Sequence, residues 1–120
     1  MKPHTDATSF GTITINGKSF KHDVLIRLDG TIKKRKKKLS KKHYGTSHKI
    51  SRDEAEHIYQ EGAESLVIGT GQYGRVHLSD GAQEFFDNRG LQVTMAATPE
   101  AIKLWNETSG LNIGLFHVTC

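Results

Sequence analysis

Alternating apolar and polar positions in the first third of the chain are typical of strands with one buried face. Residues 10–15 predict a first strand, and the Asn16-Gly17 dipeptide that follows suits a two-residue type I′ turn. Lys18 to Leu28 predict the returning strand, and Asp29-Gly30 predicts a second turn. Thr31 to Lys37 predict a third strand, whose cationic side chains favour a sheet edge.

Helical spacing replaces this alternation in the second half of the chain. Three helices are predicted from cap residues and stop signals: Ser51 to Gly62, Ser79 to Gly90, and Thr98 to Gly110. Ser51 and Glu54 fit a capping box, and Pro99 suits the first helical position after Thr98 as N-cap. Short apolar strands are predicted between and after the helices: Leu66 to Ile68, Leu91 to Ala97, and Asn112 to Cys120.

This order of elements predicts the fold class. Strands that alternate with helices imply a parallel sheet with right-handed crossovers. We therefore predict an α/β fold of three layers, with a mainly parallel central sheet, helices and an N-terminal antiparallel β-meander or hairpin. Residues 1–9 are polar and aperiodic and predict a flexible tail before a single domain over residues 10–120.

Composition narrows the class of protein. The 120 residues suit one domain, and 35% hydrophobic with 25% charged residues excludes a wholly disordered chain. The single cysteine, Cys120, cannot form an internal disulfide, which favours a reducing compartment. No signal-peptide pattern and no apolar run of membrane-helix length is present, so we expect a cytoplasmic protein without a membrane partner.

The net charge of +4 comes from one segment. Eight of the 17 basic residues lie between Lys33 and Lys42, which leaves nine basic against 13 acidic residues elsewhere. These eight are the nucleic-acid candidates: Lys33, Lys34, Arg35, Lys36, Lys37, Lys38, Lys41 and Lys42. Only Tyr44 offers an aromatic ring nearby, so a solvated edge strand and loop is the favoured interpretation.

A glycine-rich loop follows the first buried strand. Gly69-Thr70-Gly71-Gln72-Tyr73-Gly74 spells GxGxxG, but the next helix cap, Ser79, comes five residues after Gly74. A dinucleotide site is therefore not expected, and no cofactor is predicted. The loop ends a parallel strand, where small residues leave room and backbone amides can hold a small anion. The helix start at Thr98 adds a second anion-favouring feature.

Histidine and cysteine offer a second chemistry. Cys120 is a weak candidate for a nucleophile, and His48 is its candidate base. Strand alternation places His117 and Cys120 on opposite faces, so they cannot pair locally without a bend. No spacing matches a zinc site, and no metal is predicted. The alternative for Cys120 is an inert buried thiol. Asn106, on the third predicted helix, either reaches a pocket or bonds the backbone of a neighbouring loop.

Five segments carry a family resemblance in this order: Phe10-Gly11-Thr12-Ile13, Gly45-Thr46-Ser47-His48, Gly69-Thr70-Gly71, Ala101-Ile102-Lys103-Leu104-Trp105-Asn106 and His117-Val118-Thr119-Cys120. Together they resemble a small family of unknown function with archaeal and bacterial members. Its animal relatives include the adipogenesis-associated domain protein and a mitochondrial complex I assembly factor. The resemblance covers about residues 10–120 and implies a three-layer α/β domain with a parallel core sheet and an added β-hairpin.

The resemblance supplies no catalytic residue. The positions that match the family are candidate pocket residues: Gly45, Thr46, His48, Gly69, Gly71, Asn106, His117 and Thr119. The position of the glycine-rich loop and of the third helix start at the strand ends adds Thr70 and Thr98 to these candidates. The leading hypothesis is an accessory or binding domain with a small-anion pocket at the C-terminal strand ends. The alternatives are a protein-interaction or assembly-factor-like role, nucleic-acid binding, and an enzyme using His48 with Cys120.

Overall fold

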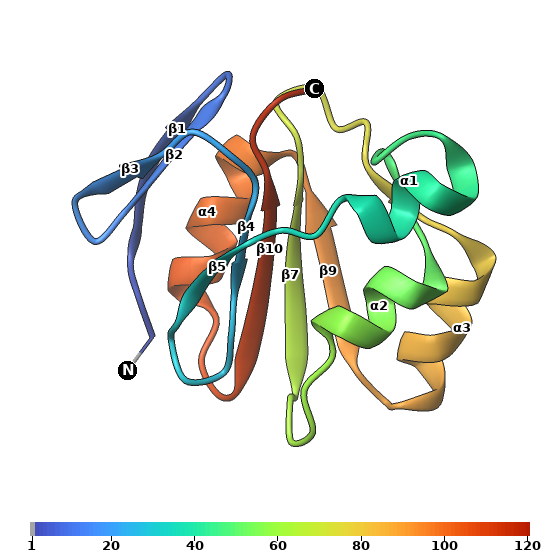
Figure 1. Cartoon of the computed structure of the whole chain (residues 1–120). Coiled ribbons are helices and arrows are strands. Elements are labelled where there is room, and N and C mark those ends of the chain that lie inside the picture. The colour runs from blue at the N-terminus through green and yellow to red at the C-terminus, as the bar shows by residue number, and fades with distance from the viewer. Residues whose placement is uncertain (1) are drawn as a thin grey trace.

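A five-stranded mixed sheet forms the middle of three layers in the computed structural model, which describes residues 2–120 (Figure 1). Its strand order is β5-β4-β10-β7-β9. The strands are β4 (Val24–Ile26), β5 (Ile32–Lys34), β7 (Ser65–Thr70), β9 (Gln92–Ala96) and β10 (Asn112–His117). Since β10, β7 and β9 run parallel and only β4 runs in the opposite direction, pairing antiparallel with both β10 and β5, the predicted fold class is confirmed.

Helices and a small second sheet cover the two faces of the central sheet (Figure 1). One face carries α2 (Arg52–Ile58) and α3 (Asp80–Asn88), beside α1 (Lys38–Tyr44) and the short parallel pair β6 (Lys49–Ile50) and β8 (His77–Leu78). The other face carries α4 (Thr98–Glu107) and the antiparallel sheet β1 (Thr5–Ser9), β2 (Thr12–Ile15) and β3 (Lys18–Phe20). Alternation along β7 sends Leu66 and Ile68 to the first face and Val67 to the second.

The amino-terminal segment is a strand and not the expected flexible tail. Residues Thr5–Ser9 form β1, which pairs with β2, while Met1 lies outside the described residues. The Trp105 Nε1–H donates to the Pro3 carbonyl at 2.8 Å, and the Asn106 side-chain amide donates to the Thr5 carbonyl at 2.8 Å. Polar residues can form this strand because β2 pairs with it across the adjacent turn, and because Asn106 of α4, 101 residues away, bonds the backbone of Thr5.

The predicted strand from Lys18 to Leu28 is wrong as a single element. It breaks into β3 and β4, which belong to different sheets, and the break contains the buried Asp23. The predicted edge strand ends at Lys34, because Arg35 turns inward, and Lys38–Tyr44 form a helix that no apolar periodicity announced. The Asn16-Gly17 turn is confirmed, with φ of 50° and 79°.

Two helix starts match their predicted caps. The Ser51 hydroxyl accepts the Glu54 amide, and the Ser79 hydroxyl accepts the Ala82 amide. The third start shifts by one residue, because Ala97 is the N-cap of α4 and the hydroxyl of Thr98 has other partners. The helices end at Ile58, Asn88 and Glu107, before the glycines that were expected to close them.

Arg35 is the central residue of a buried ionic network. Its side chain donates to both carboxylate oxygens of Glu54 at 2.7 and 3.0 Å, and to Asp23 Oδ2 at 3.0 Å. It also donates to the Ser47 carbonyl at 2.8 Å. The pairing outweighs burial and raises the pKa of Arg35, so the guanidinium stays charged. The network fixes α2, the segment before β6 and the start of β4 relative to one another.

Replacing Arg35 tests how much the fold depends on this network. Arg35→Met leaves two carboxylates buried without their cation, so we expect a loss of about 3–5 kcal/mol in the free energy of unfolding. Urea denaturation of the purified variant measures it. The control is Arg52→Met, which removes an exposed pair with Glu56 and is expected to cost less than about 1 kcal/mol. Equal losses in the two variants would contradict a structural role for the network.

Candidate metal centre

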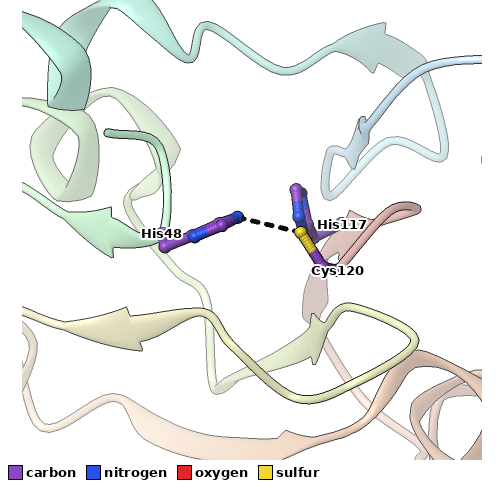
Figure 2. A group of neighbouring side chains, drawn as sticks. All are labelled: His48, His117 and Cys120. Atoms are coloured by element: carbon purple, nitrogen blue, oxygen red, sulfur yellow. Dashed lines mark hydrogen bonds between the residues drawn. The ribbon is translucent and has the colours of Figure 1, made fainter. Parts of the chain in front are cut away.

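Three side chains meet at the carboxyl ends of β7 and β10: His48, His117 and Cys120 (Figure 2). The Nε2 atom of His48 lies 3.4 Å from Cys120 Sγ, and the two imidazole rings are 5.4 Å apart at an angle of 78°. One nitrogen or sulfur atom from each residue lies within 4.8 Å of the other two. The structure thus unites residues that are 72 positions apart in the sequence.

Cys120 reaches the centre because the chain leaves the sheet after His117. Strand alternation holds only up to His117, where β10 ends, so the predicted need for a bend is met. Three backbone hydrogen bonds hold the segment after β10. The Gly11 amide donates to the Val118 carbonyl at 2.8 Å, the Gln72 amide to the Thr119 carbonyl at 2.6 Å, and the Arg75 amide to the Cys120 carbonyl at 3.1 Å. The β1–β2 turn and the loop after β7 therefore place the thiol.

The glycine-rich loop allows this close approach of chain to chain. Gly71 has a φ of +104°, and a Cβ there would lie 2.5 Å from the Cys120 carbonyl carbon. A Cβ at Gly69 would lie 2.8 Å from Thr98 Oγ1. The small residues at the strand end thus leave room for the protein's own chain, and α3 begins only at Asp80, well beyond Gly74.

The backbone amides that were expected to hold an anion have partners within the chain. The Gly71 amide donates to Thr98 Oγ1 at 2.9 Å, and the Thr98 amide donates to the Gly71 carbonyl at 3.0 Å. The Thr98 hydroxyl in turn donates to the His117 carbonyl at 2.6 Å. Thr98 therefore ties α4 to the ends of both parallel strands.

Asp23 orients His117 within the centre. The carboxylate accepts the Nδ1–H of His117 at 2.7 Å, the Val118 amide at 2.9 Å and Arg35 at 3.0 Å. These hydrogen bonds and charges outweigh burial and lower the pKa of Asp23 to about 2, so it is a pure acceptor. Because Nδ1 of His117 is bonded to Asp23, Nε2 is the ring nitrogen left for other partners, and it lies 3.1 Å from the Thr119 hydroxyl.

His48 is held by backbone contacts and remains half-buried. Its amide donates to Thr46 Oγ1 at 3.1 Å, and its carbonyl accepts the His77 amide at 2.8 Å in the β6–β8 pair. Burial, and after it the positive charge of neighbouring groups that include Arg75 and Lys37, lowers the pKa of His48. Neutral imidazole is the form that coordinates metals.

The remaining predicted pocket residues divide into neighbours of the centre and distant positions. The Thr119 hydroxyl lies 3.1 Å from His117 Nε2, and Thr70 is buried at the end of β7. Gly45 is the left-handed C-cap of α1, with a φ of 69°. Asn106 bonds a neighbouring backbone: its Oδ1 accepts the Thr5 amide and its Nδ2 donates to the Thr5 carbonyl in β1.

Sequence reasoning missed Asp23 and the buried role of Arg35. Asp23 stands beside the apolar run Val24-Leu25-Ile26, and Arg35 stands within a lysine run, so composition hides both. A carboxylate directly before a buried strand is the one signal that could have marked Asp23, because such a group needs a partner when it is buried.

The lysine-rich run is divided by the fold. Arg35 is buried in the ionic network, Lys37 lies 3.6 Å from Asp23, and Lys42 pairs with Asp53 at 2.9 Å. Besides Lys42, which is exposed but paired, five residues of the run are exposed: Lys33, Lys34, Lys36, Lys38 and Lys41. Nucleic-acid binding through this run would therefore depend on fewer charges than the sequence suggested.

A thiol and two imidazoles form a donor set for a soft divalent ion. Zinc is bound by cysteine sulfur and histidine nitrogen, and sites with three protein ligands keep a fourth position open. A metal-bound histidine usually donates its other ring N–H to a carboxylate, as His117 does to Asp23. The centre therefore has both the ligands and the supporting hydrogen bond of a metal site, although no metal was expected from the sequence spacing.

Comparison with known proteins places the chain in a family. The protein-family model described as "Protein of unknown function (DUF498/DUF598)" matches residues 5–111 of the chain. The chain belongs to this family. This match confirms the family resemblance inferred from the ordered motifs. The α/β fold that the resemblance implied is confirmed by the solved structures described next.

Two solved structures match the whole chain closely. The conserved hypothetical protein PH1505 from Pyrococcus horikoshii OT3 is 37% identical, with a TM-score of 0.90 and full coverage of both chains. The structure named MT938 is 30% identical, with a TM-score of 0.84, and covers 99% of this chain and 100% of its own. A Bordetella pertussis protein described as a Mth938-like domain shares the fold at 14% identity, with a TM-score of 0.68 over 97% of this chain and 85% of its own.

Across residues 2–120, the structure contains no helix with the length and apolar character that crossing a membrane requires.

Substitution of Gly71 tests whether the loop fixes the Cys120 segment. Gly71→Ala adds a Cβ against the Cys120 backbone at a positive φ, so we expect a loss of at least about 2 kcal/mol in unfolding free energy. Gly90→Ala is the matched control, because its φ is +65° with open space around it, and strain alone costs about 1 kcal/mol. Thermal unfolding compares the two, and equal losses would show that the close approach is unimportant.

Proposed function

We propose that this chain is a metal-binding domain, which holds a soft divalent transition-metal ion of the zinc type at the carboxyl ends of β7 and β10. The ligands are Cys120 Sγ, His48 Nε2 and His117 Nε2. The observation that carries the proposal is the convergence of one donor atom from each of these three residues within 4.8 Å of one another. In this proposal the ligand-holding groups are side chains and not the backbone amides of the expected anion pocket.

The separation of the donor atoms suits a tetrahedral ion. Zinc bonds of about 2.3 Å to sulfur and 2.0–2.1 Å to nitrogen put neighbouring ligand atoms roughly 3.3–3.6 Å apart. The observed distance from Cys120 Sγ to His48 Nε2 is 3.4 Å. Only small side-chain movements are needed for the third donor, because no donor pair is separated by more than 4.8 Å.

Existing contacts already select the coordinating atom of His117. The Nδ1–H bond to Asp23 directs Nε2 toward the other two donors, and Arg35 holds Asp23 in place. Such carboxylate partners fix the ring and raise its basicity, and their loss typically weakens metal binding 10- to 100-fold. The Nε2 atom currently faces the Thr119 hydroxyl at 3.1 Å, a neutral partner that a metal ion can displace.

Titration with Co²⁺ and Zn²⁺ tests the proposal, because Co²⁺ reports its ligands by absorption. We expect one ion per chain, a sulfur-to-cobalt charge-transfer band, and tetrahedral ligand-field bands that Zn²⁺ abolishes. Cys120→Ser removes the charge-transfer band, and both Cys120→Ser and His48→Gln weaken affinity by about tenfold or more. Both side chains are only partly buried, so these variants should fold.

His77→Gln is the matched control for His48→Gln. His77 is exposed on β8, directly beside β6, and its side chain is not part of the centre. The His77→Gln variant should bind Co²⁺ with the affinity of the unmodified protein. The proposal is wrong if the protein binds no stoichiometric metal, or if Cys120→Ser leaves the spectrum and affinity unchanged.

The second candidate is an enzyme with Cys120 as nucleophile, and the 3.4 Å contact with His48 favours it. In metal-free protein it predicts that iodoacetamide alkylates Cys120 several-fold faster than it alkylates the thiol of the urea-unfolded chain. His48→Gln should remove this advantage, whereas His77→Gln should keep it. Mass spectrometry measures the rates, and equal rates in folded and unfolded protein would contradict an activated thiol.

A further inference from the structure

Two cationic residues lie beside the proposed metal centre. Lys37 Nζ lies 3.6 Å from Asp23 Oδ2, the oxygen that also accepts the His117 ring. The amide of Arg75 donates to the Cys120 carbonyl, so this residue lies directly against the thiol-bearing residue. Arg75 is exposed and forms no ion pair within residues 2–120, so its guanidinium is available to a ligand.

The charge around the centre is positive once a metal is present. Arg35, Lys37 and Arg75 provide three cations, against the two carboxylates of Asp23 and Glu54. A divalent ion bound by one thiolate keeps a further positive charge. The surplus attracts an anion to the coordination position that the three protein ligands leave open.

We infer that the metal-loaded centre binds a small oxyanion, a carboxylate or phosphate group, at its open coordination position, with Arg75 and Lys37 as the flanking cations. The inference rests on the proposed metal site. An oxyanion is favoured over a halide because the planar guanidinium of Arg75 presents paired N–H donors that match two oxygens. Side chains must hold the anion, since the Gly71 and Thr98 amides are bonded within the chain.

Titration of the Co²⁺-loaded protein with acetate and with inorganic phosphate tests this inference. We expect at least one of them to change the ligand-field bands saturably, while neutral acetamide at the same concentration does not. The anion that binds more tightly identifies the source, a carboxylate or a phosphate ligand. Arg75→Gln and Lys37→Gln should each weaken anion binding about tenfold, the loss expected for one charge-assisted hydrogen bond.

Arg27→Gln is the control for Arg75→Gln, because Arg27 follows β4 near the start of β10, at the opposite end of the sheet. It should leave anion affinity unchanged, and all three variants are titrated with anion after saturation with Co²⁺. If Co²⁺ binds but neither anion changes its spectrum, or if both site variants bind anions normally, the inference is wrong and the metal site stands. If Co²⁺ itself does not bind, both proposals fail.

Discussion

The buried guanidinium of Arg35 is the interaction on which the rest of the molecule depends. A charge removed from water is tolerated only with partners in good geometry, and Glu54, Asp23 and the Ser47 carbonyl supply them. These partners come from α2, from the break before β4 and from the segment before β6. One side chain thus fixes three pieces of chain that share no strand pairing, and its partner Asp23 extends the constraint to β10.

The same network joins stability to chemistry. Asp23 accepts hydrogen bonds from Arg35, His117 and the Val118 amide, so the position of one imidazole is set by the core of the fold. The thiol and the second imidazole are set by the loop after β7 and by the β6–β8 pair. Each donor of the proposed metal site therefore rests on rigid structure, as binding without costly rearrangement requires.

Local signals in the sequence predicted much of the fold. Ser51, Ser79 and the Asn16-Gly17 turn act on neighbours within a few residues, so they could be recognised without knowing the tertiary structure. β1 and α1 escaped prediction because their segments are polar and lack apolar periodicity, while part of their support comes from other elements: Asn106 of α4 bonds Thr5, and Glu54 of α2 accepts from Ser40. The burial of Asp23 likewise depends on Arg35, twelve residues away, and on His117, 94 residues away.

The candidate site combines a local signal with contacts that the sequence does not show. Because parallel strands direct their carboxyl ends to one edge, the pocket was expected around Gly69 to Gly71 and the Ala97-Thr98 loop, and His117 ends β10 at this same edge. The Gly71 and Thr98 amides are bonded within the chain, and the glycines at positions 69 and 71 lie against Thr98 and Cys120. No periodicity could show that the chain leaves the strand after His117 and returns its thiol to the centre.

X-ray absorption at the zinc edge, on the protein reconstituted with one equivalent of Zn²⁺, examines the proposed metal site at the level of its bonds. The structure predicts one sulfur at about 2.3 Å and two imidazole nitrogens at about 2.0–2.1 Å, with a fourth light atom. A first shell of oxygen and nitrogen alone, without sulfur, would contradict a metal ion held by Cys120, His48 and His117.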